Sequence, residues 1–177
     1  MSTRKILLTS FRPWLEHQQS NSSDDLLALV QDLDFPKVEL IFLRQLIVDT
    51  KLASKKVIAA IAQHQPDIIL CCGMAESRQI LTLESQASYK EKHFQTQLNL
   101  EKFCGNLRQA TVSNDAGKFV CEGLYFHVLE YLQKKQLSTQ VTFVHIPSLT
   151  ATNKDIIFKD FQKIIECLGW NLEDYLN

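Results

Sequence analysis

The run Pro66-Asp67-Ile68-Ile69-Leu70-Cys71-Cys72-Gly73 decides the fold of this chain. Its centre holds five consecutive apolar residues between a proline and a glycine, which is typical of a strand buried on both faces of a sheet. The stretch before it, Leu52–Gln63, carries its apolar residues at helical spacing. A helix that leads into a doubly buried strand is typical of an α/β fold with a parallel sheet.

The same alternation extends along the chain in both directions. Strands are predicted at Lys5–Thr9, Val38–Leu43, Ile68–Cys72, Ile80–Gln86, Ala110–Val112 and Val141–Ile146. Helices are predicted after Asn21-Ser22-Ser23-Asp24-Asp25 and at Leu52–Gln63, Leu100–Leu107, Phe119–Gln133 and Lys154–Leu168. Residues 88–99 are polar and are predicted to form a loop. The pattern predicts a single α/β domain over residues 1–177, a three-layer α/β/α sandwich with a largely parallel, mixed central sheet.

Composition and charge narrow the class of protein. With 177 residues and 45% hydrophobic content, the chain is long enough to bury one substantial core. Its net charge of −1 argues against a nucleic-acid partner, and no apolar run has the length of a transmembrane helix or the form of a signal peptide. Five cysteines, an odd number without C-x-x-C spacing, indicate reduced thiols rather than disulfides or a metal site. We therefore expect a soluble, cytoplasmic protein with no membrane partner.

Cys121 differs from the other cysteines in its position along the chain. It follows the polar, glycine-containing turn Ser113–Phe119 and falls in the first turn of a predicted helix. The unpaired N–H groups and the dipole of a helix start favour a thiolate over a thiol. A thiolate is the nucleophile of a cysteine hydrolase. The remaining cysteines lie in strand-like or helix-like patterns, and we interpret them as packing residues.

Partners for Cys121 are sought where strands end, because functional residues of parallel α/β folds gather there. His145 ends a predicted strand, where a general base is useful, although a structural histidine is the simpler interpretation of it alone. Glu84 has two possible interpretations. Its carboxylate could orient a histidine, or it could be a surface carboxylate of an edge strand. Phe11 and Trp14 either line an apolar pocket or cap the core.

Taken together and in order, these segments resemble the pyroglutamyl peptidase I family of cysteine peptidases. The most specific match is Ser113–Cys121, which is similar to the family signature S-x-x-A-G-x-F-V-C. Near the N-terminus, Ile6–Trp14 is similar to the family's opening strand and GF-x-PF loop, and Asn21-Ser22-Ser23 is similar to its N-P-S motif. Further along, Arg78 matches a family arginine and Leu83-Glu84 falls where the family has its catalytic glutamate. His145-Ile146-Pro147 is similar to the family's H-[VI]-P histidine motif.

This resemblance implies a site and a substrate class. The implied catalytic triad is Glu84, Cys121 and His145, acting on peptides with a pyroglutamyl N-terminus. The implied substrate-binding residues are Phe11, Trp14, Met74, Phe119 and Val120. The family needs no metal or organic cofactor, and it points to self-association as a homo-oligomer.

The chain departs from the family pattern at several positions. Ser10, Trp14, Ser22 and Glu122 replace the glycine, phenylalanine, proline and asparagine that the family has. The string E-R-V-A-I-N and the long substrate loop that follow the family's glutamate are replaced and shortened after Glu84. Two alternatives therefore stay open, a thiol amidohydrolase with another small acyl substrate and a non-catalytic binding protein on the same scaffold.

Overall fold

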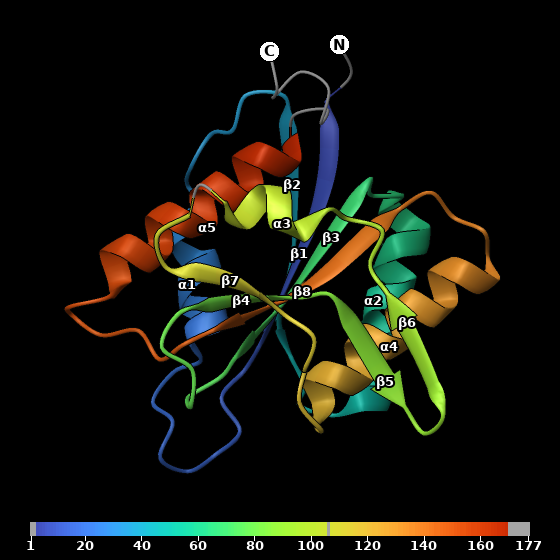
Figure 1. Cartoon of the computed structure of the whole chain (residues 1–177), viewed down its shortest axis with the longest axis horizontal. Coiled ribbons are helices and arrows are strands. Elements are labelled where there is room, and N and C mark those ends of the chain that lie inside the picture. The colour runs from blue at the N-terminus through green and yellow to red at the C-terminus, as the bar shows by residue number, and fades with distance from the viewer. Residues whose placement is uncertain (1–2, 106, 170–177) are drawn as a thin grey trace.

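Strands and helices alternate along the computed structural model, which describes residues 3–105 and 107–169 (Figure 1). The strands are β1 (Arg4–Phe11), β2 (Val38–Leu46), β3 (Ile68–Met74), β4 (Leu81–Glu84), β5 (Gln86–Tyr89), β6 (Lys92–Gln95), β7 (Ala110–Ser113) and β8 (Gln140–Ile146). The helices are α1 (Ser22–Val30), α2 (Thr50–His64), α3 (Leu100–Cys104), α4 (Val120–Lys134) and α5 (Lys154–Gly169). The predicted domain of residues 1–177 also includes residues 1, 2, 106 and 170–177, which lie outside the described ranges.

The main sheet has the strand order β2-β1-β3-β8-β4-β7 within the part of the chain that the structure describes. Strands β2, β1, β3 and β8 run parallel to one another. Strand β4 pairs antiparallel with β8 and parallel with β7. The prediction of a largely parallel, mixed sheet is confirmed.

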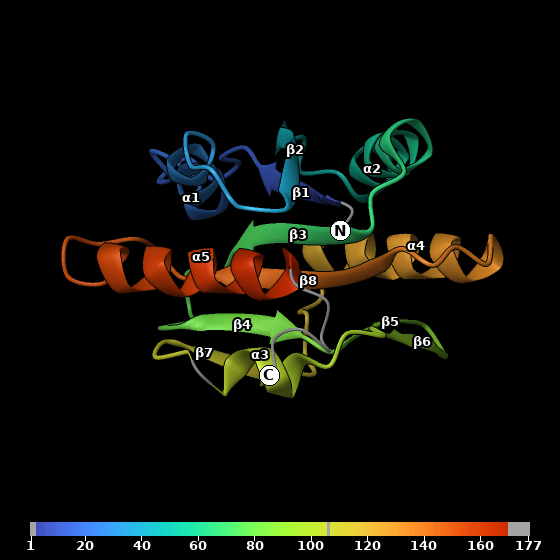
Figure 2. The same cartoon turned by 90° about the horizontal axis from the view of Figure 1, so that it is seen from above.

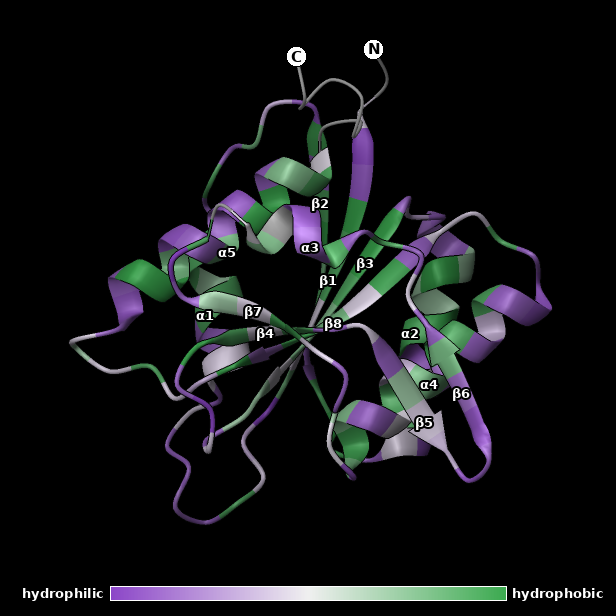
Figure 3. Cartoon of the chain, in the orientation of Figure 1, coloured by the Kyte–Doolittle hydropathy of each residue, from purple (hydrophilic) through white to green (hydrophobic). Residues whose placement is uncertain are grey.

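Helices cover both faces of this sheet, as the three-layer prediction requires. Figures 1 and 2 show α1 and α5 on one side of the strands and α2 and α4 on the other. Strand β3 serves both layers: Ile68, Leu70 and Cys72 pack with α1 and α5, whereas Ile69 and Cys71 pack with α2 and α4. This double burial explains its unbroken apolar run, and Figure 3 shows hydrophobic residues along β1 and β3. No described helix combines the length and the apolar character that crossing a membrane requires.

The prediction of a loop over residues 88–99 is wrong in part, because β5 and β6 form an antiparallel hairpin. The hairpin packs on α4 through Ala87, which is buried, and through Phe94, whose ring centroid lies 5.1 Å from that of Phe126. Ala87 and Phe94 pair across the two strands, and they are the apolar side chains of the hairpin that join the core cluster of α2 and α4. The segment therefore lacked enough apolar residues to show a strand pattern in its sequence.

A buried polar cluster fixes the start of α1 beside the ends of β1 and β2. Asp24 accepts hydrogen bonds from Ser10 Oγ at 2.7 Å, from Arg44 Nε at 2.8 Å and from Gln45 Nε2 at 3.0 Å. Burial opposes the charge of Asp24, but the hydrogen bonds from Arg44, Ser10 and Gln45 outweigh it and lower the pKa of this carboxyl. Ser22 Oγ also donates to the carbonyl of Ile146 at 3.1 Å, which ties α1 to the end of β8.

Candidate active site

Strand register brings residues from β3, β4 and β8 together on one face of the sheet. Gly73 on β3 pairs with His145 on β8, and on the other side of β8 Thr82 pairs with His145 and Glu84 with Phe143. Because alternate residues of a strand point to the same face, these side chains share the face that α2 and α4 cover. Phe143 lies within the core cluster of that face.

Glu84 and His145 form a buried pair. His145 Nδ1 lies 2.8 Å from Glu84 Oε1, and the two residues are 5% and 0% exposed. Since an ionised carboxylate only accepts, this contact places a proton on Nδ1, and in the neutral imidazole Nε2 then carries the free lone pair. Tyr125 Oη and Thr142 Oγ1 donate to the backbone carbonyl of Glu84 at 2.8 and 3.1 Å, so its main chain is held as well. Glu84 is thus an interior residue, not a surface carboxylate of an edge strand.

Cys121 lies in the first turn of α4 and faces the sheet at Gly73. A Cβ atom built on Gly73 would stand 2.8 Å from Cys121 Sγ and 2.8 Å from Phe143 Cζ, closer than real side chains pack. The missing side chain of Gly73 is therefore the space into which the sulfur fits. The rings of Phe143 and His145 lie with their centroids 4.7 Å apart. The sulfur accordingly lies at the end of β3, against the strand that carries His145.

Burial acts against the thiolate that the start of α4 is expected to favour at Cys121. Burial raises the pKa of the Cys121 thiol to about 12, with further increases from Cys71 and from the Glu84 carboxylate. A backbone hydrogen bond and the charge of Arg78 act in the opposite direction and are weaker. Desolvation is thus the largest influence on this pKa. A thiol whose pKa is raised in this way needs a base if it is to become a nucleophile.

The first turn of α4 leaves backbone donors available beside the sulfur. The N-cap residue, Phe119, makes no side-chain capping hydrogen bond. Gly123 N–H bonds to the Phe119 carbonyl at 3.1 Å as the first helical contact of α4, so the N–H groups of residues 120–122 have no acceptor within the helix. Such donors at a helix start are suited to an anion or to a developing oxyanion.

A groove of about 550 Å³ lies beside the start of α4. Three of the sequence-predicted substrate residues line it, namely Trp14, Phe119 and Val120. Trp14 is 57% exposed and Phe119 is 79% exposed. Phe11 and Met74 are placed elsewhere. Phe11 is buried in the α2/α4 core cluster, and Met74 ends β3 with its Sδ accepting from the Ser22 N–H at 3.4 Å.

Two further residues at this site were not assigned a role from the sequence. Arg78 Nη1 lies 3.0 Å from Glu84 Oε1, and Thr82 Oγ1 donates to the same oxygen at 3.0 Å. The sequence does point to Arg78, since this residue matches an arginine of the family. For Thr82, the sequence offers only its position two residues before Glu84. This spacing places both side chains on the same face of a strand, but it does not show which face of the sheet that is.

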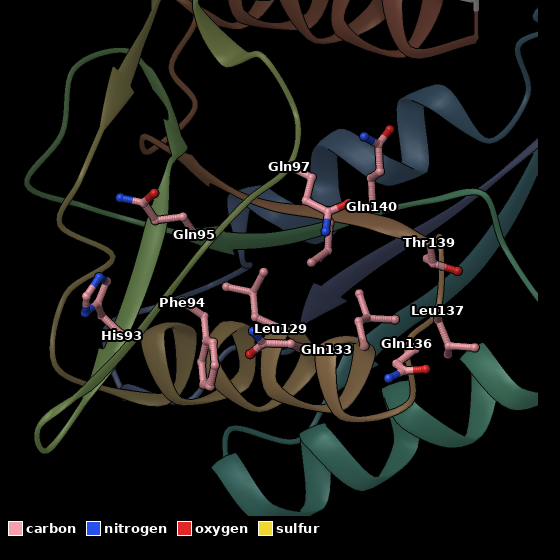
Figure 4. A pocket seen from close by; sticks show the side chains of 12 residues that line it. His93, Phe94, Gln95, Gln97, Leu129, Gln133, Gln136, Leu137, Thr139 and Gln140 are labelled. Carbon is pink, nitrogen blue, oxygen red and sulfur yellow. The ribbon is translucent and has the colours of Figure 1, made fainter.

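A different cavity, of about 370 Å³, lies away from these residues, at the start of β8 and the end of α4 (Figure 4). Its walls combine apolar side chains such as Phe94 and Leu129 with several glutamines, including Gln95, Gln133 and Gln140. None of the predicted catalytic or substrate residues lines it. This cavity therefore belongs to a different part of the molecule.

An α/β sheet, a buried histidine–carboxylate pair and a helix-start cysteine together have the elements of a cysteine hydrolase site. The family model described as pyroglutamyl peptidase matches residues 94–163, which include Cys121 and His145. The predicted resemblance to the pyroglutamyl peptidase I family is thereby confirmed, and the relatives and solved structures below support it.

Relatives cover most of the chain at modest identity. A pyrrolidone-carboxylate peptidase of Brachyspira hyodysenteriae is 25% identical over 203 positions, covering 94% of this chain and 100% of the relative. One from Vibrio vulnificus is 28% identical over 173 positions, covering 82% of this chain and 79% of the relative. Because the first alignment is longer than the 177 residues of this chain, the chain lacks residues that the relative has.

Solved structures share the fold. Pyroglutamyl peptidase I from Bacillus amyloliquefaciens superimposes with a TM-score of 0.85 at 21% identity, covering 97% of each chain. Pyrrolidone carboxyl peptidase from Fervidobacterium islandicum gives a TM-score of 0.80 at 19% identity, covering 93% of this chain and 98% of the other. The α/β/α architecture described above is therefore that of these peptidases.

Proposed function

We propose that this protein is a cysteine exopeptidase that hydrolyses the amide bond after an N-terminal pyroglutamyl residue. The observation that carries the proposal is the buried 2.8 Å contact between Glu84 and His145 on the strand beside the Cys121 sulfur. The matched family and the named relatives supply the substrate class.

The first half-reaction begins with the thiol of Cys121. His145, held by Glu84 with Nδ1 protonated, takes the thiol proton on Nε2 as Sγ attacks the amide carbonyl carbon. The C–S bond forms and the carbonyl electron pair moves onto oxygen. The free N–H groups in the first turn of α4 stabilise that oxyanion. Because burial raises the pKa of this thiol, we expect the proton to leave as the sulfur attacks rather than beforehand.

The second half-reaction returns the enzyme to its starting state. His145, now an imidazolium stabilised by the Glu84 carboxylate, donates its Nε2 proton to the leaving amine as the C–N bond breaks. Water then attacks the thioester, giving a proton to His145, and Cys121 leaves and regains that proton. The sequence of steps uses only these side chains and water.

The groove beside α4 is the proposed site for the pyroglutamyl ring. The ring is flat and uncharged, and Trp14, Phe119 and Val120 offer it apolar contact at the start of α4, the helix whose first turn carries Cys121. We propose that Phe11 and Met74 act from behind this surface, by shaping the ends of β1 and β3. The residues that follow the pyroglutamyl group extend away from the ring.

The test is an assay of a fluorogenic pyroglutamyl amide with the wild type, Cys121→Ala and Cys104→Ala. Cys104 is a partly exposed cysteine on α3, so its variant controls for loss of a thiol elsewhere. The proposal expects turnover that Cys121→Ala abolishes and Cys104→Ala preserves. Turnover of other N-acyl amides alone, again lost in Cys121→Ala, would indicate a thiol amidohydrolase of different specificity. No turnover of either class would leave a binding protein on this scaffold.

We further propose a cytoplasmic location and peptides with a blocked N-terminus as substrates. All five cysteines lie among the described residues as free thiols, which suits a reducing compartment. Self-association as a homo-oligomer stays a prediction, which light scattering at micromolar concentration tests.

A further inference from the structure

Arg78, on the connection between β3 and β4, has both ends of its guanidinium engaged. Nη1 lies 3.0 Å from Glu84 Oε1 and also hydrogen-bonds Thr82 Oγ1. Nη2 donates to the backbone carbonyl of Asp115 at 2.6 Å. The Arg78 side chain is 23% exposed, and the Glu84 side chain that it contacts is fully buried. A planar guanidinium with several fixed donors is suited to such a two-sided contact.

The contact at Nη1 sets the rotation of the Glu84 carboxylate. Oε1 receives His145 Nδ1, Thr82 Oγ1 and Arg78 Nη1, whereas Oε2 has no hydrogen-bond partner among the described residues. All three donors thus point at the same oxygen of the carboxylate. The carboxylate is held in the orientation in which one oxygen faces His145, and a partial rotation would weaken all three of these contacts at once.

The contact at Nη2 reaches the segment that delivers Cys121. Asp115 lies between β7 and α4, in a turn fixed by the Asp115 N–H donating to Ser113 Oγ at 3.1 Å and the Gly117 N–H donating to Asp115 Oδ1 at 3.0 Å. Gly117 has a φ of 90°, which favours glycine, so the turn has one preferred path. Holding the Asp115 carbonyl therefore holds the approach to the start of α4.

We propose that Arg78 is a positioning residue of the catalytic site, which couples the orientation of Glu84 to the placement of Cys121. The inference rests on the proposed function and deepens it. Arg78 acts through Glu84 and the turn, not by touching the substrate. It should therefore contribute to kcat, which depends on the geometry of the triad, and little to KM.

The test compares Arg78→Met, Arg78→Lys and the control Arg108→Met. Arg108 is exposed and lies beside α5, away from the site. We expect Arg78→Met to lower kcat for the pyroglutamyl amide by about 10- to 100-fold with KM changed by less than about threefold. Arg78→Lys, which keeps the charge but has one donor group, should recover part of this loss. Arg108→Met should match the wild type.

A second measurement is independent of the substrate. The rate at which iodoacetamide alkylates Cys121 at pH 8.5, followed by peptide mass spectrometry, should fall in Arg78→Met and fall less in Arg78→Lys. The charge of Arg78 lowers the pKa of this thiol, so its removal slows alkylation. If the wild type does not cleave pyroglutamyl amides, the proposed function fails, but this rate still decides the role of Arg78.

Several outcomes would overturn the inference. Arg78→Met with wild-type kcat and alkylation rate would show that the bridge does not act on the site. A raised KM with unchanged kcat would place Arg78 against the substrate instead. Circular dichroism and thermal melting check that each variant folds. If Arg78→Met does not fold, Arg78→Lys decides, because a fully active lysine variant would contradict the need for two separate contacts.

Discussion

Single residues set the surroundings of the Cys121 sulfur, and Gly73 does so through the side chain that it lacks. Its position on β3 is opposite His145, and its open face receives the sulfur of Cys121. A glycine is required there by space rather than by backbone conformation, because a Cβ would meet both Cys121 and Phe143. The site thus depends on a residue with no functional group.

Replacing Gly73 by alanine should displace the sulfur from its position. The new methyl group would lie 2.8 Å from Cys121 Sγ and from Phe143 Cζ, so both must move. We expect kcat to fall by about tenfold or more and the free energy of unfolding to fall by about 1–3 kcal/mol. Gly105→Ala is the matched control, since its nearest neighbour would be at an ordinary 3.6 Å. Equal kcat values for the two variants would argue against this packing.

The raised pKa of Cys121 makes its alkylation strongly dependent on pH. Only the thiolate reacts, and a thiol pKa of about 12 leaves a thiolate fraction of about 10⁻⁵ at pH 7. The rate with iodoacetamide should therefore rise about tenfold for each pH unit from 7 to 10. Cys104, with a pKa of about 11, should show the same slope at a higher rate. A plateau of the Cys121 rate near neutral pH would reveal a preformed thiolate.

The sequence identified Cys121, His145 and Glu84 as candidates because each belongs to a recognisable local pattern. It did not identify the roles of Gly73 and Thr82. Their importance arises from strand register, since each pairs with His145 on a neighbouring strand. Register between distant strands is a property of the folded sheet, and no local pattern reports it. The effect of burial on the pKa of Cys121 could not be predicted for a related reason, because burial depends on the whole fold.

At the scale of elements, the link between α1 and the sheet depends on the charge of Asp24. We expect Asp24→Asn to lower the free energy of unfolding by about 2 kcal/mol at pH 7, because the hydrogen bonds from Arg44 and Ser10 lose a charged acceptor. The exposed Asp32→Asn should change it little. Urea denaturation provides the measurement.

The same variant should lose its effect in acid. The folded-state pKa of Asp24 is below its ordinary value of 3.8, so its stabilisation is complete above that value and disappears as the pH falls through the folded-state pKa. The difference between the wild type and Asp24→Asn should therefore be constant from about pH 5 to 7 and should narrow below about pH 4. A difference that stays the same at pH 3 would assign the effect to packing.

Elements with strong periodicity were predicted and the hairpin was not. Strand β3 buries a continuous run of apolar residues, and helix α5 buries a full stripe of them along one face. Both patterns are easily recognised in the sequence. The β5–β6 hairpin buries little more than Ala87 and Phe94, and its stability comes from packing on α4. A short segment stabilised by a neighbour distant in sequence carries a weak local pattern.

At the scale of the whole molecule, the groove is assembled from segments distant in the sequence. Trp14 comes from the loop after β1, Tyr89 from β5 and Phe119 from the turn before α4. The order of the α/β elements was predictable, and so was the end of the sheet at which such a groove forms. The neighbours of Trp14 were not, because the hairpin that supplies Tyr89 was not predicted.

Trp14→Ala should weaken substrate binding more than catalysis. The indole contributes apolar surface to the groove but no group to the triad, so KM for the pyroglutamyl amide should rise about three- to tenfold. We expect kcat to stay within about twofold of the wild type. Leu52→Ala removes an exposed apolar side chain that does not line the groove and is the control. Unchanged KM in Trp14→Ala would place the ring elsewhere.

The recess at Gly73 has a consequence for inhibitors of this protein. The sulfur of Cys121 fills a space between β3 and the ring of Phe143, so the reactive atom is also part of the packing between the sheet and α4. A reagent that bonds to this sulfur must add its atoms on the side away from Gly73, because a single methyl group on that residue already meets the sulfur. Groups that extend away from Gly73 should leave this packing intact, whereas groups that turn toward β3 should loosen it, and the heat stability of each adduct would distinguish the two.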